Sequence, residues 1–428
     1  MSLTTLVRGT VLFLLLSAFA CLPALAGPVP RSINEIVALA LKHSAELIAL
    51  EKEASAKQSL SIQAGTISNP TLELQGVTGS LTGSPEERSV SIGINQELPL
   101  NNKLLLRREV ILRDAEAAHY QRNNAARLLQ DEIIALTLDY SLTAKRQELA
   151  AELVKLNREL VVVAEERFKA GDIPELDFNL AKVELARAQT RLLEAERDKD
   201  PHRVKIASLT GLEGADINLS EMFISPKLSQ GVQELVKQAL VFRPDLLMLA
   251  REREKAEIEA HLSEAEALPN LTAGLFVQWQ RGTTEIGGMS SVNSDTQLGL
   301  RLSMPIPVFD RNQGGRHAAR AHQDSADSRK LALERNITAE VEAAVSRVTA
   351  SERILAMFEQ GIIPQLTENL KLTQEAYRIG EVGILSVIDE QKKFFEVSDS
   401  YLVAIYGRQM AFLKLETAMA TELSGGMQ

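Results

Sequence analysis

Several residue types are scarce in this sequence, and each scarcity removes a class of protein. The 428 residues include one cysteine, which excludes a disulfide framework and a cysteine-rich metal site. Aromatic residues make up only 4%, and glycine (24) and proline (14) are sparse, as in chains of long uninterrupted helices. The formal net charge of −10 lacks the basic excess that pairs with phosphates, so we expect no nucleic-acid partner.

The sequence also lacks the motifs of common enzyme classes. It contains no HExxH, GxSxG or GxxxxGK[ST] segment. Glu257 and His261 are four residues apart, but two ligands without a third are better explained as a solvated helix surface. We therefore expect no enzymatic activity, no cofactor and no bound metal.

Residues 1–26 have the pattern of a secretory signal peptide. The apolar stretch Val11–Ala20 is followed by Ala24-Leu25-Ala26, which offers small residues at the positions that a signal peptidase reads. We predict cleavage before Gly27, with a membrane anchor as the alternative and lipidation at Cys21 as a second processing route. No later stretch reaches the roughly 18 consecutive apolar residues of a membrane-spanning helix. The sequence thus predicts an exported protein.

An internal repeat organises the rest of the chain. The matching segments are 35–72 with 234–271, at an offset of 199, and 168–173 with 377–382, at an offset of 209. The additional residues of the second copy fall between Gln280 and Asp295. We therefore divide the mature chain into a first repeat, 27–225, and a second repeat, 226–428, as expected for duplication of one unit.

Each repeat reads as helix, two strands, long helix, turn and helix, which makes the fold class mainly α with a small β part. The predicted helices are 33–66, 103–168, 174–210, 232–267, 312–377 and 384–422. The predicted strands are about 70–80, 89–99, 270–280 and 295–305, with loops at 79–88 and 281–295. Apolar residues at alternating spacings of four and three mark a coiled-coil seam in the first long helix. They are Leu149, Leu153, Leu156, Leu160 and Val163.

The strands alternate between apolar and polar residues. Leu271, Ala273, Leu275, Val277 and Trp279 share one face of the third strand. Such strands of about ten residues are typical of a transmembrane barrel, although a half-buried soluble sheet has the same alternation. Four strands cannot close a membrane barrel, so several chains must share one, and three chains would supply twelve strands. We expect Trp279, the only tryptophan, in an aromatic girdle at the membrane interface.

Two features resemble the TolC family of outer-membrane efflux channels, in particular its heavy-metal (cobalt–zinc–cadmium) resistance branch. They are the segment Met304–Gly314 (MPIPVFDRNQG) and the duplicated turns at Gly171 and Gly380. The resemblance covers about residues 31–424. It implies a homotrimer with a 12-stranded β-barrel in outer-membrane lipid and a long periplasmic α-helical coiled-coil barrel. It also implies docking to a periplasmic adaptor (membrane fusion protein) and an inner-membrane RND-type pump.

The two glycine turns carry the most interpretable chemistry. Gly171 and Gly380 can end their helices in the left-handed conformation. Acidic or hydroxyl side chains with the spacing of a capping box follow each glycine. The candidate cap pairs are Asp172 with Glu175 and Ser386 with Asp389.

By resemblance, the turns form the periplasmic tip of the channel. Asp177, Ser386 and Asp389 fall where family members place residues that line the narrow end, which makes them candidate gate residues. Seven residues at or beside the turns would contact an adaptor. These are Arg167, Lys169, Gly171, Asp172, Arg378, Gly380 and Glu381.

The sequence therefore predicts a passive exit duct of a tripartite efflux pump, which carries metal cations or small toxic compounds across the periplasm and outer membrane. The alternative is a periplasmic adaptor or structural coiled-coil protein. Adaptors normally have one helical hairpin flanked by compact β domains, whereas this chain has two hairpins that bracket its strands. An exported hydrolase is a third class, for which the sequence offers no nucleophile or metal constellation.

Overall fold

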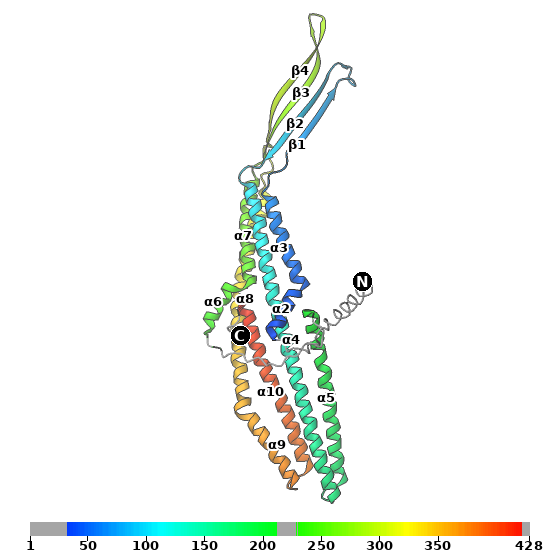
Figure 1. Ribbon diagram of the computed structural model, residues 1–428. Helices are drawn as coiled ribbons and strands as arrows, with labels where there is room; N and C mark the ends of the chain where they lie inside the picture. The colour runs from blue at the N-terminus through cyan, green and yellow to red at the C-terminus, as the bar shows by residue number, and fades with distance from the viewer. Residues whose placement is uncertain (1–31, 212–227, 229, 422–428) are drawn as a thin grey trace, which may run out of the picture. The chain divides into compact units, whose positions relative to one another are not determined.

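The computed structural model of the chain describes residues 32–211, 228 and 230–421, and helices dominate it (Figure 1). The predicted signal peptide and Cys21 lie outside the described residues, as does most of the junction between the repeats. The described residues divide into two compact units. Unit 1 falls within 1–43, 136–223 and 373–395, and unit 2 falls within 44–135, 224–372 and 396–428.

Helices and strands follow the predicted order in both repeats, so the mainly α fold class with a small β part is confirmed. The first repeat contains α2 (Ile33–His43), α3 (Ala45–Ala64), β1 (Thr71–Thr78), β2 (Arg88–Leu98), α4 (Lys103–Ala170) and α5 (Glu175–Thr210). The second repeat contains α6 (Val232–Phe242), α7 (Pro244–Glu266), β3 (Leu271–Ile286), β4 (Met289–Ser303), α8 (Gln313–Met357), η2 (Phe358–Ile362), α9 (Ile363–Arg378) and α10 (Ile384–Met419).

Each repeat breaks its first helix at an equivalent residue, Ser44 or Arg243, which are 199 positions apart. The extended Ser44 accepts a hydrogen bond from the Leu47 N–H at 3.3 Å through its hydroxyl oxygen. Arg243 is also extended, because Pro244 disfavours helical geometry in the residue before it. The predicted single helices were wrong, since the apolar periodicity runs through both breaks.

The predicted helix 312–377 is also interrupted. One π-helical turn, η2, separates α8 from α9. A π-helical turn accommodates an additional residue within an α-helix. The first-repeat counterpart, α4, runs from Lys103 to Ala170 as one α-helix. The interruption therefore distinguishes the two repeats.

The four strands form one antiparallel sheet in the order β1-β2-β3-β4 (Figure 1). A loop joins β1 to β2, as predicted. β3 and β4 stay paired as far as Ile286 and Met289, with only Gly287 and Gly288 between them. The φ values of these glycines, +63° and +84°, suit a two-residue hairpin turn. The predicted loop 281–295 was therefore wrong, because the additional residues of the second repeat lengthen a hairpin.

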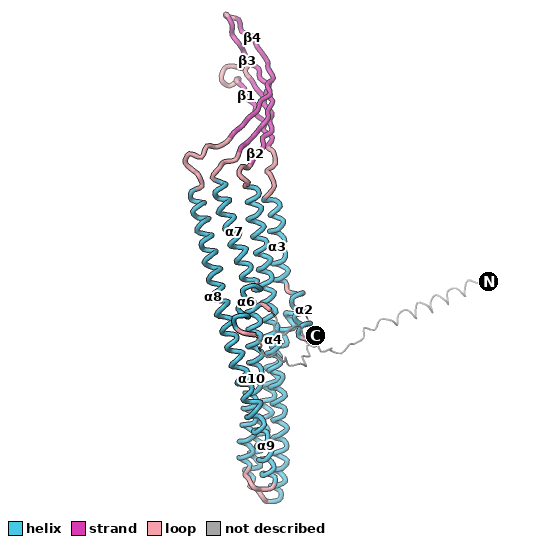
Figure 2. The backbone as a smooth tube through the Cα atoms, turned by 90° about the vertical axis from the view of Figure 1, so that its left-hand side faces the viewer, coloured by secondary structure: helices cyan, strands magenta, loops and turns pink. Residues whose placement is uncertain are grey.

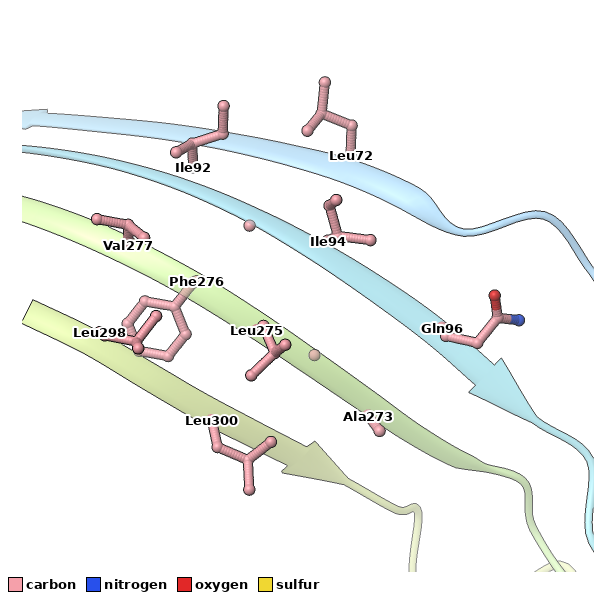
Figure 3. Close-up of a pocket in the computed structure, with 12 residues that line it drawn as sticks. Leu72, Ile92, Ile94, Gln96, Ala273, Leu275, Phe276, Val277, Leu298 and Leu300 are labelled. Atoms are coloured by element: carbon pink, nitrogen blue, oxygen red, sulfur yellow. The ribbon is translucent and has the colours of Figure 1, made fainter.

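One face of the sheet is apolar (Figure 3). Leu72, Ile94, Leu275 and Leu300 form a row across all four strands in the register. Their exposed fractions are 65%, 57%, 62% and 66%. A continuous apolar face of this width is characteristic of a surface that contacts another protein or a membrane.

Trp279 lies at one end of the apolar face. It pairs with Val90, and the next pair on the same face is Arg88 with Arg281. Where a membrane barrel leaves the bilayer, its strands carry apolar residues first, then an aromatic residue and then charged residues, which is the order seen here. Eight residue steps separate Leu271 from Trp279, or roughly 26 Å of strand. This length is close to the apolar band of about 25 Å in such barrels.

The helices of unit 2 pack around an apolar core. Leu235 of α6, Ile337 and Val341 of α8, and Leu415 of α10 all have exposed fractions of 0%. These side chains come from both ends of the second repeat, so their burial holds α6 and α10 against α8. The sheet does not contribute to this cluster.

A buried arginine marks the helix break beside this core. Arg243 is 5% exposed and donates hydrogen bonds to Asp245 at 2.5 Å, Glu340 at 2.5 Å and the Ala418 carbonyl at 3.3 Å. Burial would raise the pKa of Asp245, but the hydrogen bonds and charge of Arg243 outweigh it and hold that pKa below its ordinary value. The break is thus fixed by a charge cluster that joins α7, α8 and α10.

We predict that Arg243→Ala lowers the free energy of unfolding of unit 2 by about 3–5 kcal/mol, because it leaves the Asp245 carboxylate buried without its cation. Chemical denaturation at neutral pH, monitored by helix content, measures the loss. Arg253, whose side chain is 39% exposed and lies 2.5 Å from Asp327, gives a matched control at the surface. Arg253→Ala should change little, because a surface ion pair adds little stability.

The same cluster predicts a pH dependence. Asp245 has a depressed pKa in the folded state, so its contribution is present at neutral pH and is lost as pH falls below about 4. The stabilities of the wild type and Arg243→Ala should therefore converge on acidification. A stability difference that stays constant from pH 7 to pH 3 would contradict this assignment.

Candidate functional site

The two glycine turns of unit 1 have the same backbone geometry. Gly171 has a φ of +81° and Gly380 a φ of +86°. The N–H groups of Gly171 and Asp172 donate to the carbonyls of Phe168 and Arg167 at 3.0 and 2.9 Å. The second turn repeats both bonds, from Gly380 to Tyr377 and from Glu381 to Ala376, at 3.1 and 2.9 Å. This pair of bonds is the glycine-dependent helix stop called the Schellman motif.

The predicted capping boxes are wrong. The N-cap of α5 is Pro174, and no side chain caps the helix there. Asp172 precedes Pro174 and lies too early in the turn to reach the free N–H groups of α5. Ser386 lies inside the first turn of α10, which begins at Ile384, so it is not an N-cap either. Pro174 sets the start of α5. The second turn ends before Ile384, so α10 begins two residues ahead of Ser386.

The turns are held by an apolar core. Its buried residues come from α4, α5, α9 and α10. They are Leu160, Ala164, Ala181, Tyr377, Ile384, Val387 and Ile388. Helix faces from both repeats therefore meet in one cluster, and the tip behaves as one packed body.

The predicted coiled-coil seam of α4 is confirmed at Leu149, Leu153 and Leu160, which are buried, and differs at its other positions. Its buried stripe is Ala150, Leu153, Asn157, Leu160 and Ala164, whose exposed fractions lie between 0% and 5%. These residues keep the alternating spacing of three and four that a heptad requires. The prediction included only large apolar residues. It missed two alanines and an asparagine whose side chain donates back to the Leu153 carbonyl at 2.9 Å.

Arg167 links the two turns. Its Nη1 donates to the Tyr377 carbonyl at 2.9 Å, and its guanidinium lies 4.9 Å from the centroid of the Tyr377 ring. A Cβ placed on Gly380 would be 3.4 Å from the Arg167 Nη2. Figure 2 shows the two turns side by side as loops next to α9. Arg167, predicted as an adaptor contact, therefore has partners within its own chain.

Tyr377 is the buried partner in this link. It is 2% exposed, and no described residue makes a hydrogen bond of normal geometry to its hydroxyl, although Arg167 lies close enough to lower the pKa of the phenol through a weak one. Burial raises the pKa of Tyr377, and the nearby charge of Asp177 raises it further, while Arg167 opposes both. The phenol is therefore neutral at physiological pH. Asp177, a predicted gate residue, is half-buried close to this ring.

The other two predicted gate residues share the exposed side of α10. Ser386 and Asp389 are exposed one turn apart, while Val387 and Ile388 between them are buried. Asp389 lies 2.7 Å from Lys393, and the two side chains are 65% and 56% exposed. Their arrangement is a polar stripe that faces away from the tip core.

Most of the predicted adaptor contacts are exposed at the turns. Lys169 lies 2.8 Å from Glu165, and its hydrogen bond and charge lower the pKa of that carboxyl. Arg378 lies 3.8 Å from Glu375. Asp172 and Glu381 occupy equivalent exposed positions after the two glycines. The tip surface therefore carries both signs of charge.

The prediction missed the aromatic residues of the tip. Phe168 and Tyr377 are equivalent in the repeat, each three residues before its glycine. Phe168 stacks on Phe178 with ring centroids 5.5 Å apart, and Lys182 lies 3.8 Å from the Phe178 centroid. The duplicated aromatic position was visible in the sequence and could have identified this packing.

Within the described residues, no group of three or more His, Cys, Asp or Glu side chains is placed to hold a metal ion. Among the helices that the structure describes, none combines the length and apolarity that a membrane crossing requires.

The sequence matches the family model described as "Outer membrane efflux protein" over residues 36–212 and 235–421. The chain belongs to this family. It is therefore an efflux channel protein of the outer membrane with a periplasmic helical part. This assignment confirms the predicted family and localisation, and it excludes the adaptor and structural coiled-coil alternative. The family is one of channels and not a known family of enzymes.

Individual relatives agree with the family assignment. The chain is 22% identical to the cobalt-zinc-cadmium resistance protein CzcC of Cupriavidus metallidurans, over 87% of this chain and 86% of the relative. It is 23% identical to the pyoverdine export outer membrane protein OpmQ of Pseudomonas putida, over 92% and 86% of the two chains. A crystal structure of CusC has a TM-score of 0.74 at 16% identity, covering 94% of this chain and 99% of that one. The fold is therefore that of CusC.

We predict opposite effects for two substitutions in the link between the turns. Tyr377→Phe removes a buried hydroxyl that lacks a well-formed hydrogen bond to any described residue and should raise stability by up to about 1 kcal/mol. Arg167→Ala removes the hydrogen bond and ring contact between the turns and should speed amide hydrogen exchange near Gly380. Native-state exchange followed by mass spectrometry measures both. Equal exchange in Arg167→Ala and the wild type would show that Arg167 does not hold the turns together.

Proposed function

We propose that three copies of this chain form one passive exit duct, with the driving energy supplied by an inner-membrane pump. The apolar row across all four strands, ending at Trp279 and two arginines, is the observation that carries this proposal. Contact with lipid shields this apolar face from water. β1 and β4 are the outer strands of the sheet, and pairing them between chains satisfies their backbone groups in the bilayer. Three chains give twelve strands, enough to close a barrel.

Residues 1–26 direct export in this proposal and are removed before Gly27. Trp279 belongs to the aromatic girdle at one membrane interface. It is 48% exposed on the apolar face, next in register to the pair Arg88 and Arg281. An indole ring in that position has its apolar body in the acyl region and its N–H near the headgroups.

The gate of the duct is the polar stripe of α10 together with Asp177. In a trimer, three copies of Asp389 surround the narrow periplasmic end. Each carboxylate is paired with Lys393 of its own chain, which offsets part of the repulsion between them. A partner that changes this pairing changes the balance between closed and open tips.

The adaptor contacts the exposed residues around the two turns. The backbone geometry is the same in both turns, so three chains present six similar turns to the partner. Lys169, Asp172, Arg378 and Glu381 provide charges of both signs on this surface, with Gly171 and Gly380 fixing its shape. Arg167 acts from behind them by holding the turns together.

The exported compounds are metal cations or small toxic compounds. Similarity to CzcC, a cobalt-zinc-cadmium resistance protein, favours metal cations. The second relative, OpmQ, is named for pyoverdine export, so relatives of this chain differ in cargo. The duct itself is passive, and substrate choice is made by the pump.

The first test is the mass and conductance of the mature protein in detergent and in a planar bilayer. We expect a species of about three times the chain mass that gives small, mostly closed currents. A water-soluble monomer without currents would overturn the trimeric duct.

The gate is tested with Asp389→Ala in the same bilayer. We expect longer and more frequent openings, because Lys393 then keeps only its longer contact with Glu390, 3.7 Å away, and the charge balance at the tip changes. Asp198, 57% exposed and 2.8 Å from Arg197, is a matched exposed aspartate away from the turns. Asp198→Ala should conduct like the wild type. If Asp389→Ala leaves both conductance and metal tolerance unchanged, Asp389 is not a gate residue.

A further inference from the structure

An ion pair crosses the polar face of the sheet from one outer strand to the other. Arg301 of β4 donates to the Glu73 carboxylate of β1 at 2.8 Å through its Nη1. Asn95 of β2 donates to the same carboxylate oxygen at 2.7 Å. The Arg301 guanidinium also lies 5.2 Å from the centroid of the Phe276 ring of β3. All four strands therefore contribute to one group of contacts, which we call the clasp.

Three glycines make room for the clasp. Gly93, Phe276 and Gly299 are paired side by side, and a Cβ on Gly299 would lie only 2.3 Å from the Phe276 ring. Gly274 lies between Asn95 and Arg301 in the register, and a Cβ there would lie 2.0 Å from the Asn95 side chain. Larger residues at these positions would displace the Phe276 ring that contacts Arg301 and the Asn95 amide that donates to Glu73.

The glycines also explain why Phe276 departs from the alternation of β3. Its neighbours Leu275 and Val277 are on the apolar face, so Phe276 is on the polar one. There its ring covers Gly299 and supplies a platform for the Arg301 guanidinium. An aromatic residue on the polar face is thus part of the clasp and not an interruption of the pattern.

We propose that the clasp is an ion-selectivity element of the pore wall, whose paired charges keep this level of the pore from favouring cations or anions. The inference rests on the proposed duct, in which the apolar face contacts lipid and the opposite face lines the pore. Arg301 and Glu73 are 43% and 44% exposed, so both charges act on ions in the water that fills the pore. Because each charge offsets the other, cations and anions meet little net charge at this level of the barrel.

Removing one partner leaves the other charge uncompensated, and three chains place three such charges at the same level. At low salt a charge on the wall acts over about 10 Å, which is comparable with the half-width of such a pore. Glu73→Gln should shift selectivity toward anions and Arg301→Gln toward cations. We expect each ratio of cation to anion permeability to change roughly two- to fivefold in 0.1 M salt and much less in 1 M salt.

The experiment measures the reversal potential of each variant in planar bilayers under a potassium chloride gradient. The double variant, Glu73→Gln with Arg301→Gln, is uncharged and should return to wild-type selectivity. Arg281 and Glu86 form a matched pair, 3.2 Å apart, outside the clasp. Arg281→Gln and Glu86→Gln make the same charge changes and should leave the reversal potential unchanged.

Opposite shifts in the two single variants, with restoration in the double variant, support the proposal. Unchanged reversal potentials in all clasp variants overturn it while leaving the conducting duct intact. Loss of the trimeric mass in the single variants also overturns it, because the clasp would then serve only assembly. Absence of current from the wild-type trimer would reject the duct and the selectivity element together.

Discussion

The exposed apolar face of the sheet is the constraint on which the rest of the structure depends. The row from Leu72 to Leu300 is open to solvent in the single chain, and β1 and β4 are outer strands. While the chain is alone, the apolar face is unfavourable in water, and the unpaired backbone groups of the outer strands are unfavourable in lipid. The same four strands satisfy both requirements once several chains share a barrel. In the proposed duct, assembly thus follows from having too few strands for the surface that they present.

Much of the fold could be predicted from the sequence because its signals are long or duplicated. The repeat, the four strands, the long helices and the two glycine turns were all predicted. The predictions failed where a local interaction competes with periodicity. Ser44 and Pro244 end helices within apolar patterns, and Pro174 moves the start of α5 away from Asp172. Gly287 and Gly288 form a tight turn where polar residues suggested a long loop.

The candidate site also contains features that the sequence predicts and features that only the structure shows. Backbone geometry at Gly171 and Gly380 follows from the residue type alone, since a positive φ favours glycine. The contact between Arg167 and Tyr377 could not be predicted, because it joins residues 210 positions apart through tertiary packing. The clasp is similar, since Arg301 and Glu73 are 228 positions apart and meet only through the register of four strands. The alternation of apolar and polar residues puts both residues on the polar face, but only the pairing of the strands brings them into contact.

The unequal hairpins have a consequence for the outer surface of the cell. β3 continues for seven residues beyond Trp279, or roughly 23 Å, whereas the β1–β2 hairpin turns soon after the same level. In a trimer the rim of the barrel would alternate between three tall and three short hairpins. The tall ones, tipped by two glycines, would be the parts of the protein that antibodies and bacteriophages reach first.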